Sequence, residues 1–388
     1  MVARQEWDSM KTFVFLIVAA ILFVAQTLPA LAQKEHIEFY KQFNEALEAG
    51  DFAAAEEAGE RAWRTAETEL GDSQTTAVLA YNYAAQIYFS TPEKAIEPLE
   101  RVIEIAGEGS GLFGAEPPAL MLAFVRAAAN KKNIRLQSTL EKQLEQFDKQ
   151  HDAKTALSAR GWMHVAQYKF RNYSHAQARR AADSAVCHYS AHRESLPIEY
   201  INALLTRGIS TVSGQSRSNS DLESANQDFI DAIDMFPPQK DIESFDPLFA
   251  KALAWHAATI SITLSRDAGE RRLGSRLTEE PPDLGWYDAV EWTTPNPSYE
   301  ECDFTWKNRQ APEYPKVPRG QYSIGGVLLG YHTEGTKVVG ARILAEVPEY
   351  FGFGKLALKA VENWELESPP TNPACARNRM LTIFYTLE

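Results

Sequence analysis

Histidine and cysteine side chains are the residues of this sequence that could bind a metal ion or act as nucleophiles. Of the eight histidines, only His188 and His192 are four residues apart, a spacing that would let them share a metal ion on one helix face. Cys187 beside them points elsewhere, and no acidic third ligand stands at a recognisable spacing. The sequence also lacks an H-E-x-x-H motif, a G-x-S-x-G motif and a P-loop. We therefore expect no metal site, no cofactor and no enzyme activity.

The composition indicates a folded protein with more than one domain. The chain has 388 residues, of which 45% are hydrophobic and 11% aromatic, enough apolar surface to offset the entropy lost when a core becomes ordered. Its net charge of −13 repels a phosphate backbone, and no basic stripe compensates for that charge. Nucleic acid is therefore not expected as a partner.

Residues 1–32 have the pattern of a cleaved signal peptide. An uncharged apolar run, Phe13–Ala25, is shorter than the roughly twenty residues that a bilayer span needs. Ala30 and Ala32 then form the A-x-A pattern that signal peptidase reads, and Met10 can serve as the start of the signal. We expect cleavage after Ala32 and export to the periplasm. Without cleavage, the run would anchor the protein in the inner membrane.

Residues 33–275 are predicted to form pairs of amphipathic helices. From Glu35 to about Asp267, apolar residues recur at three- and four-residue spacing in Ala-rich stretches, and the alternation typical of strands is nearly absent. The clearest unit is a turn, Gly50-Asp51-Phe52, followed by a helix with small residues at Ala55, Gly59 and Ala62.

This unit resembles a tetratricopeptide repeat, in which a Gly-Asp-aromatic turn precedes a helix with small packing residues. Related units follow at irregular intervals: Tyr81, Asn82 and Ala84 with Ala95, Leu99 and Val102; Trp162, Ala166 and Tyr168 with Tyr173, Ala176 and Ala178; and Ala225, Phe229, Ala232 and Pro237. The resemblance implies a degenerate solenoid whose groove takes a peptide or a partner helix.

Residues 276–309 are rich in Pro and Trp and are predicted to connect the helices to a C-terminal domain, with irregular structure packed on a neighbour. Beyond them, residues 310–388 read in the order ββαβ. The predicted elements are a hairpin of Gly326–His332 and Val338–Ala345 around a turn at Glu334–Lys337, a helix from Gly354 to Trp364, and a last strand, Arg379–Leu387. The predicted fold class is therefore an all-α helical-repeat solenoid followed by a small α+β domain.

The ordered motifs of residues 310–388 resemble the C-terminal domain of the TonB family of envelope energy transducers. They are Pro312-Glu313-Tyr314-Pro315, Gly325-Gly326-Val327, Gly335, Val338-Val339, the helix from Ala357 to Trp364, Pro369, and the strand from Met380 to Leu387. The apolar segment Phe13–Ala25 lacks the histidine of the family's motor-coupled anchor, and helical repeats replace its Pro-rich spacer. The resemblance therefore covers the C-terminal domain and leaves open whether the chain transduces force.

In that family the last strand and the region before the first strand meet a short extended segment of outer-membrane receptors. The physical basis is a sheet edge whose free N–H and C=O groups accept another strand. Carried over by position, the resemblance implies partner contacts at Arg309, Gln310, Tyr314, Met380, Thr382, Phe384 and Thr386. Leu381, Ile383 and Tyr385 point to the opposite face, and the sequence leaves open which face the helix covers.

Two hypotheses follow. In the first, the protein is a periplasmic, non-enzymatic adaptor whose TonB-like domain captures an extended segment of an envelope protein. In the alternative, it is a helical-repeat scaffold in which the TonB-like domain is only a structural or dimerisation unit, so that recognition lies in the repeat groove.

The chain contains three cysteines, two of which can pair in an oxidising compartment. Cys302 and Cys375 lie on either side of one compact C-terminal segment, and a bond between them would tie its entry to its exit. Cys187 would then remain as a buried thiol within a helix.

Overall fold

The computed structural model divides into two compact units, residues up to Ala203 and residues from Leu204. It describes residues 34–107, 113, 116–214, 218–237, 239, 245–267, 274–277, 302, 304–313, 324–349, 352–377 and 379–386. For residues 264–267, 274–277, 324 and 386, only the backbone is described. The predicted signal peptide lies outside these residues, as does most of the Pro- and Trp-rich segment 276–309. None of the described helices is long and apolar enough to cross a membrane.

The first unit is built of helices, each packed on the helix before it and the helix after it. They are α2 (Glu35–Ala49), α3 (Phe52–Leu70), α4 (Gln74–Ile87), α5 (Ile96–Ala106), α6 (Pro118–Ala129), α7 (Ile134–Gln150), α8 (Ala156–Arg171) and α9 (His175–Ser190). A further helix, α10 (Pro197–Val212), spans the division between the units. The predicted helical region is confirmed for the described residues from Glu35 to Asp267, whereas Gly274 and Ser275, the end of the predicted range, belong to a strand.

The predicted turn between α2 and α3 has the local chemistry that ends one helix and begins the next. Gly50 adopts the left-handed conformation with φ of 70°, which a residue without a Cβ reaches at no steric cost. The Asp51 side chain caps α3 by accepting a hydrogen bond from the backbone N–H of Ala54. A Cβ added at Gly59 would lie 3.0 Å from the ring of Phe43, so the small residue permits close packing of the two helices.

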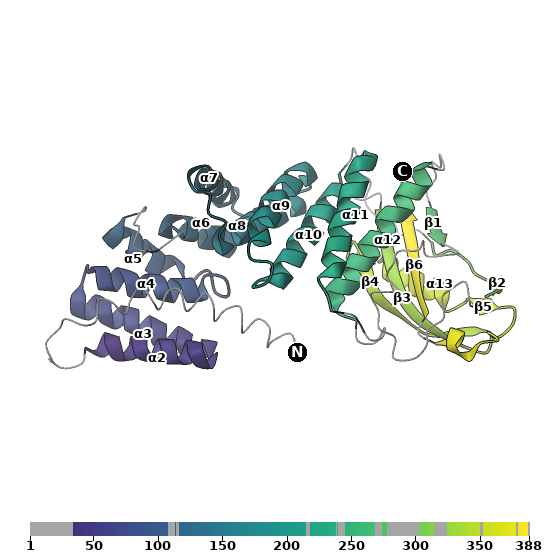
Figure 1. The fold of residues 1–388 in the computed structure, drawn as a ribbon, viewed down its shortest axis with the longest axis horizontal. Coiled ribbons are helices and arrows are strands. Elements are labelled where there is room, and N and C mark those ends of the chain that lie inside the picture. Colours follow the sequence, from purple (N-terminus) through teal and green to yellow (C-terminus); the bar gives the residue numbers. More distant parts are fainter. Residues whose placement is uncertain are drawn as a thin grey trace. The chain divides into compact units, whose positions relative to one another are not determined.

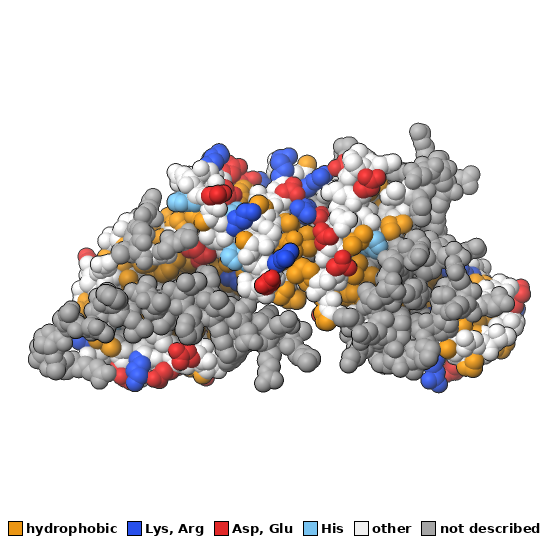
Figure 2. All heavy atoms as spheres, viewed as in Figure 1, with side chains coloured by type: hydrophobic (Ala, Val, Ile, Leu, Met, Phe, Trp, Pro, Cys, Tyr) orange, Lys and Arg blue, Asp and Glu red, His pale blue; other side chains and the backbone are white. Residues whose placement is uncertain are grey.

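Ion pairs join helices of the first unit across its surface. The guanidinium of Arg64 on α3 lies 2.6 Å from the carboxylate of Glu97 on α5, and Arg126 on α6 lies 2.6 Å from Glu100. Exposed pairs of this kind contribute only about 0–1 kcal/mol each. On the face drawn in Figure 2, acidic and basic side chains are interspersed over the helices and form no patch of a single sign.

The second unit combines helices with a sheet. Its helices are α11 (Asn219–Asp234) and α12 (Pro247–Asp267), followed later by α13 (Phe353–Val361) and the short 3-10 helix η3 (Pro373–Ala376). Its strands are β1 (Gly274–Leu277), β2 (Trp306–Asn308), β3 (Ile324–Glu334), β4 (Lys337–Val347), β5 (Glu365–Leu366) and β6 (Arg379–Thr386). Among the described residues these form one six-stranded sheet, and every strand pairing in it is antiparallel, in the order β1-β6-β3-β4-β5-β2 (Figure 1).

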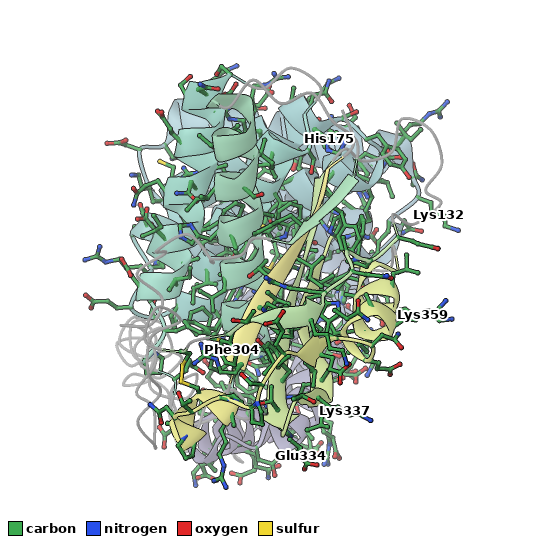
Figure 3. All side chains as sticks on the ribbon, turned by 90° about the vertical axis from the view of Figure 1, so that its right-hand side faces the viewer. Lys132, His175, Phe304, Glu334, Lys337 and Lys359 are labelled. Carbon is green, nitrogen blue, oxygen red and sulfur yellow. A yellow bond between two sulfur atoms is a disulfide. The ribbon has the colours of Figure 1, made fainter. Side chains whose placement is uncertain are left out.

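The predicted hairpin, helix and last strand are confirmed, each within a few residues of its predicted bounds. Gly335, with φ of 60°, makes the turn between β3 and β4. Figure 3 shows Glu334 and Lys337 together at the tip of this hairpin, and Lys359 on the outer side of α13. On the inner side of α13, Phe353, Ala357 and Val361 are buried against β3 and β6 in one apolar core.

The opposite face of the sheet is covered by α12 (Figure 1). A Cβ added at Gly326 on β3 would lie 3.3 Å from the Cβ of Ala258 and 3.4 Å from the carbonyl oxygen of Ala254, so α12 packs closely on the strand. On the other face, a Cβ at the neighbouring Gly325 would lie 2.6 Å from the ring of Phe353. Both faces of β3 are therefore covered by helices.

This packing places the division between the units away from the predicted one. The sequence suggested separate domains at 33–275 and 310–388, whereas the second compact unit begins at Leu204. Its helix α12 contacts β3, β4 and β6. Strand β1, which includes the first two residues of the predicted connecting segment, pairs with the last strand. The sheet therefore shares its unit with the end of the helical region.

Candidate partner-binding site

The last strand, β6, lies second from one end of the sheet. Along its whole length it pairs with β3, from Arg379 opposite Tyr331 to Thr386 opposite Ile324. On its outer side, β1 pairs with the second half of the strand, with Leu277 opposite Ile383 (Figure 1). No strand among the described residues pairs with the outer side of the first half, from Arg379 to Thr382.

The predicted partner-binding side chains of β6 are buried, not exposed. Met380, Thr382 and Phe384 are only 2%, 1% and 1% exposed, respectively. Leu381 and Ile383, on the other face, belong to the core under α13, so alternation directs the first three toward α12. Contact of these side chains with a partner is therefore a wrong expectation, because two helix layers enclose the strand. The backbone at its outer edge is the part of β6 that another segment could reach.

Tyr385 lies on the face of β6 that packs against α13. Its side chain is buried beside Phe353, with ring centroids 4.5 Å apart, and its hydroxyl donates a hydrogen bond to the Phe353 carbonyl oxygen at 3.1 Å. Burial raises the pKa of the Tyr385 hydroxyl, because the interior disfavours the charged phenolate. The α13 face of β6 is therefore part of a packed core.

The two described residues of the predicted region before the first long strand come together at the far end of the sheet. The guanidinium of Arg309 lies 5.3 Å from the ring of Trp306 and 5.2 Å from that of Trp364, within the range of cation–π contact. The Trp364 indole donates a hydrogen bond to the carbonyl oxygen of Gln310 at 2.9 Å. Tyr314 and the side chain of Thr386 lie outside the described residues.

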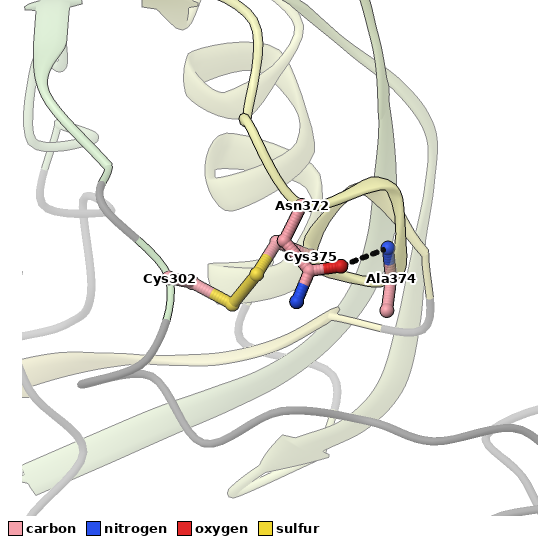
Figure 4. The surroundings of a disulfide bond; sticks show 4 residues. All are labelled: Cys302, Asn372, Ala374 and Cys375. Carbon is pink, nitrogen blue, oxygen red and sulfur yellow. Dashed lines mark hydrogen bonds between the residues drawn. A yellow bond between two sulfur atoms is a disulfide. The ribbon is translucent and has the colours of Figure 1, made fainter.

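A disulfide fixes the start of β6. Cys302 and Cys375, the two cysteines that the sequence analysis paired, are bonded with their Cα atoms 5.7 Å apart (Figure 4). The bond joins the segment that leads into β2 to the short helix η3, which the Asn372 side chain caps by accepting a hydrogen bond from the N–H of Ala374 (Figure 4). Phe304, labelled in Figure 3, lies under the guanidinium of Arg379 at 5.2 Å.

The histidine pair considered in the sequence is separated in the structure. The Nε2 atom of His188 lies 3.1 Å from a carboxylate oxygen of Asp148, whereas Nε2 of His192, beyond the end of α9, lies 2.8 Å from the carbonyl oxygen of Lys154. Among the described residues, no three His, Cys, Asp or Glu side chains come together as metal ligands. Cys187 is exposed, so the expectation of a buried thiol is wrong.

No protein-family model matches the chain, and a search of curated proteins finds no match either.

The sequence analysis missed the short strands β1, β2 and β5, and of these β1 is the one that pairs with β6. Its four residues, Gly-Ser-Arg-Leu, begin with two poor strand formers and are too few for alternation to be visible. It pairs with a strand more than a hundred residues later in the chain, and the local sequence does not predict such a pairing.

Proposed function

We propose that the protein is a non-enzymatic adaptor of the cell envelope, exported to the periplasm, whose strand β6 binds an extended segment of a partner protein at its outer edge. The observation that carries this proposal is the pairing of β1 with that edge. An edge that accepts one short strand has the backbone geometry to accept another. The resemblance to the TonB family points to the same strand.

Binding at this edge requires no exposed side chain of β6. Strand addition takes its affinity from main-chain hydrogen bonds, so burial of Met380, Thr382 and Phe384 does not oppose it. Half of the outer edge, Arg379–Thr382, pairs with no described strand, and the disulfide next to it holds the start of β6 in place. A partner segment would begin pairing there and extend toward Thr386.

The helical unit supplies a second surface. Its helices pack in sequence order, and small residues such as Gly59 and Ala62 lie at the contacts, as in a tetratricopeptide-like array. Such an array takes a peptide or a partner helix in its groove, so the adaptor would join two partners or grip one partner twice.

Site-specific photo-crosslinking in Gram-negative cells tests the proposal. A photoreactive residue is placed at Arg377, which is exposed two residues before β6, or at Gln310, which is exposed beside Trp364 in the predicted contact region. As a matched control, it is placed at Lys337 on the hairpin tip. The proposal predicts adducts with an envelope protein at the first two positions and none at Lys337. Adducts absent from both Gln310 and Arg377, in cells where the protein is exported and folded, would contradict it.

A second candidate function is favoured by the cover on both faces of the sheet. Close packing of Gly326 on α12 is what a purely structural cap of the helical region would need. In that case recognition lies in the helices, and a photoreactive residue at the exposed Phe89 would give the adducts instead. The same set of variants therefore separates the two functions.

A further inference from the structure

The outer edge of β6 is unevenly occupied. Among the described residues, all eight residues of β6 pair with β3 on the inner side, whereas the four residues of β1 pair with Ile383–Thr386 on the outer side. A segment that paired with the whole outer edge would therefore align with twice as many residues as β1 does.

β1 is also built to be held weakly. In the part of the chain that the structure describes, it is the outermost strand at its end of the sheet and pairs with β6 alone. Gly274 and Ser275 are poor strand formers, and a strand of four residues gains little from pairing alone. Short edge elements of this kind open locally at a free energy well below that of global unfolding.

We infer that β1 is an exchangeable internal strand: it occupies the acceptor edge of β6 in the free protein and is displaced when an extended segment of a partner binds there. The biological use of this exchange rests on the proposed function, whereas the exchange itself is a property of the chain alone. The ligand class is an extended polypeptide segment of up to about eight residues that bonds through its backbone. While β1 is paired, it prevents unspecific pairing of other proteins with this edge, and only a segment that pairs more strongly displaces it.

Tethering gives β1 its advantage over a competitor. A strand joined to its site by a short chain has an effective concentration on the order of millimolar, so a free peptide must overcome that concentration to bind. If β1 occupies the edge for about nine-tenths of the time, the apparent affinity of a competitor falls about tenfold. A substitution that weakens the pairing of β1 with β6 should therefore raise the apparent affinity of the competitor by up to about tenfold.

The probe is a fluorescently labelled peptide with the sequence of residues 271–280, and its binding to the full chain is measured by anisotropy. Ser275→Pro and Arg276→Pro form a matched pair, because successive N–H groups of a strand point to opposite sides and only one of the two is aimed at β6. The variant that loses this N–H should bind the peptide about tenfold more tightly than the wild type. The other variant should resemble the wild type, because proline is tolerated where an edge strand has no pairing N–H.

A double-cysteine variant should hold β1 on the edge of β6 permanently. Gly274 and Thr386 are register partners, so Gly274→Cys with Thr386→Cys should form a cross-strand disulfide that locks β1 in place. The locked protein should bind the peptide less tightly than the wild type does. Equal binding by the wild type, both proline variants and the locked protein would overturn the inference, even if one proline variant folds poorly.

The two proposals fail in different ways. If the proline variant binds the peptide but Gln310 and Arg377 give no adducts in cells, the exchange stands and the partner-capture function is wrong. If adducts form with the same yield in the wild type, the proline variants and the locked protein, the function stands and the exchange of β1 is wrong.

Discussion

The helical unit and the sheet of the second unit are held together in opposite ways. In the first unit, the helices from α2 to α9 pack mainly on the helices next to them in the chain. In the sheet, β6 lies between β3 and β1, strands that begin 55 and 105 residues earlier (379 − 324 and 379 − 274). The helical unit is therefore held by contacts between consecutive helices, whereas the sheet depends on strands that are far apart in the sequence.

Loss of the disulfide should have the largest effect, and it should be confined to the second unit. Replacing Cys302 and Cys375 by Ser frees a loop that spans 73 residues, which costs up to about 4 kcal/mol in the chain-entropy account. Peptide-resolved hydrogen exchange in urea should show β6 and β2 unfolding earlier while α2–α9 are unchanged. Cys187→Ser is the control, because this thiol is exposed and free. Equal loss of stability in both units would contradict the separation.

Disruption of the contact between α12 and the sheet comes next. Gly326→Leu forces a side chain into the space 3.3 Å from Ala258, and overpacking of this kind costs about 3 kcal/mol. His332→Leu, on the same strand but exposed, should cost far less. Thermal unfolding of the full chain should lose stability in the first variant only. A wild-type melting curve for Gly326→Leu would show that the helix does not hold the sheet.

The corresponding change in the helical unit should have a smaller effect. Gly59→Leu pushes against the ring of Phe43, 3.0 Å from where the Cβ would lie, and the end of a side chain yields more easily than backbone. We expect about 2 kcal/mol, with faster hydrogen exchange in α2, α3 and α4. Ala54→Leu, on the exposed side of the same helix, is the control. Spread of the effect into the sheet would contradict the local character of the unit.

The smallest predicted effect is a pH dependence in the helical unit. Burial, with the charges of Arg171 and Lys131, lowers the pKa of His164 to about 4 from 6.5, and its Nε2 lies 2.9 Å from the side-chain oxygen of Gln137. Between these pKa values the unfolded chain binds more protons than the folded chain, so stability is complete above pH 6.5 and falls as the pH falls toward 4.

The measurement compares His164→Gln with the wild type at pH 7 and pH 5. The wild type should lose about 1 kcal/mol more than the variant over this interval, after a discount for solvent screening. His332→Gln, an exposed histidine of the other unit, should follow the wild type. Parallel pH profiles for the wild type and His164→Gln would show that His164 does not remain neutral in the fold.

The same contrast explains what the sequence could predict. Gly50, Asp51 and the small residues after them act within one turn of the chain, so the helical pairs were recognisable. Gly335 and the two valine-rich strands beside it likewise predicted the hairpin. The cover of Met380 and Phe384 by α12 was not visible, because it depends on a helix more than a hundred residues earlier. The sequence of a strand rich in apolar residues does not show whether helices cover one of its faces or both.

Residue-resolved hydrogen exchange of the native full chain, measured by NMR along β6, shows directly whether β1 leaves the edge of β6. Of the N–H groups of Ile383–Thr386, alternate ones point toward β3 and toward β1. The account predicts that those facing β1 exchange by local opening at a low free energy, while those facing β3 require unfolding of the sheet. If all four groups exchange at the same high free energy, β1 is a permanent part of the sheet and the edge of β6 is not an exchangeable binding site.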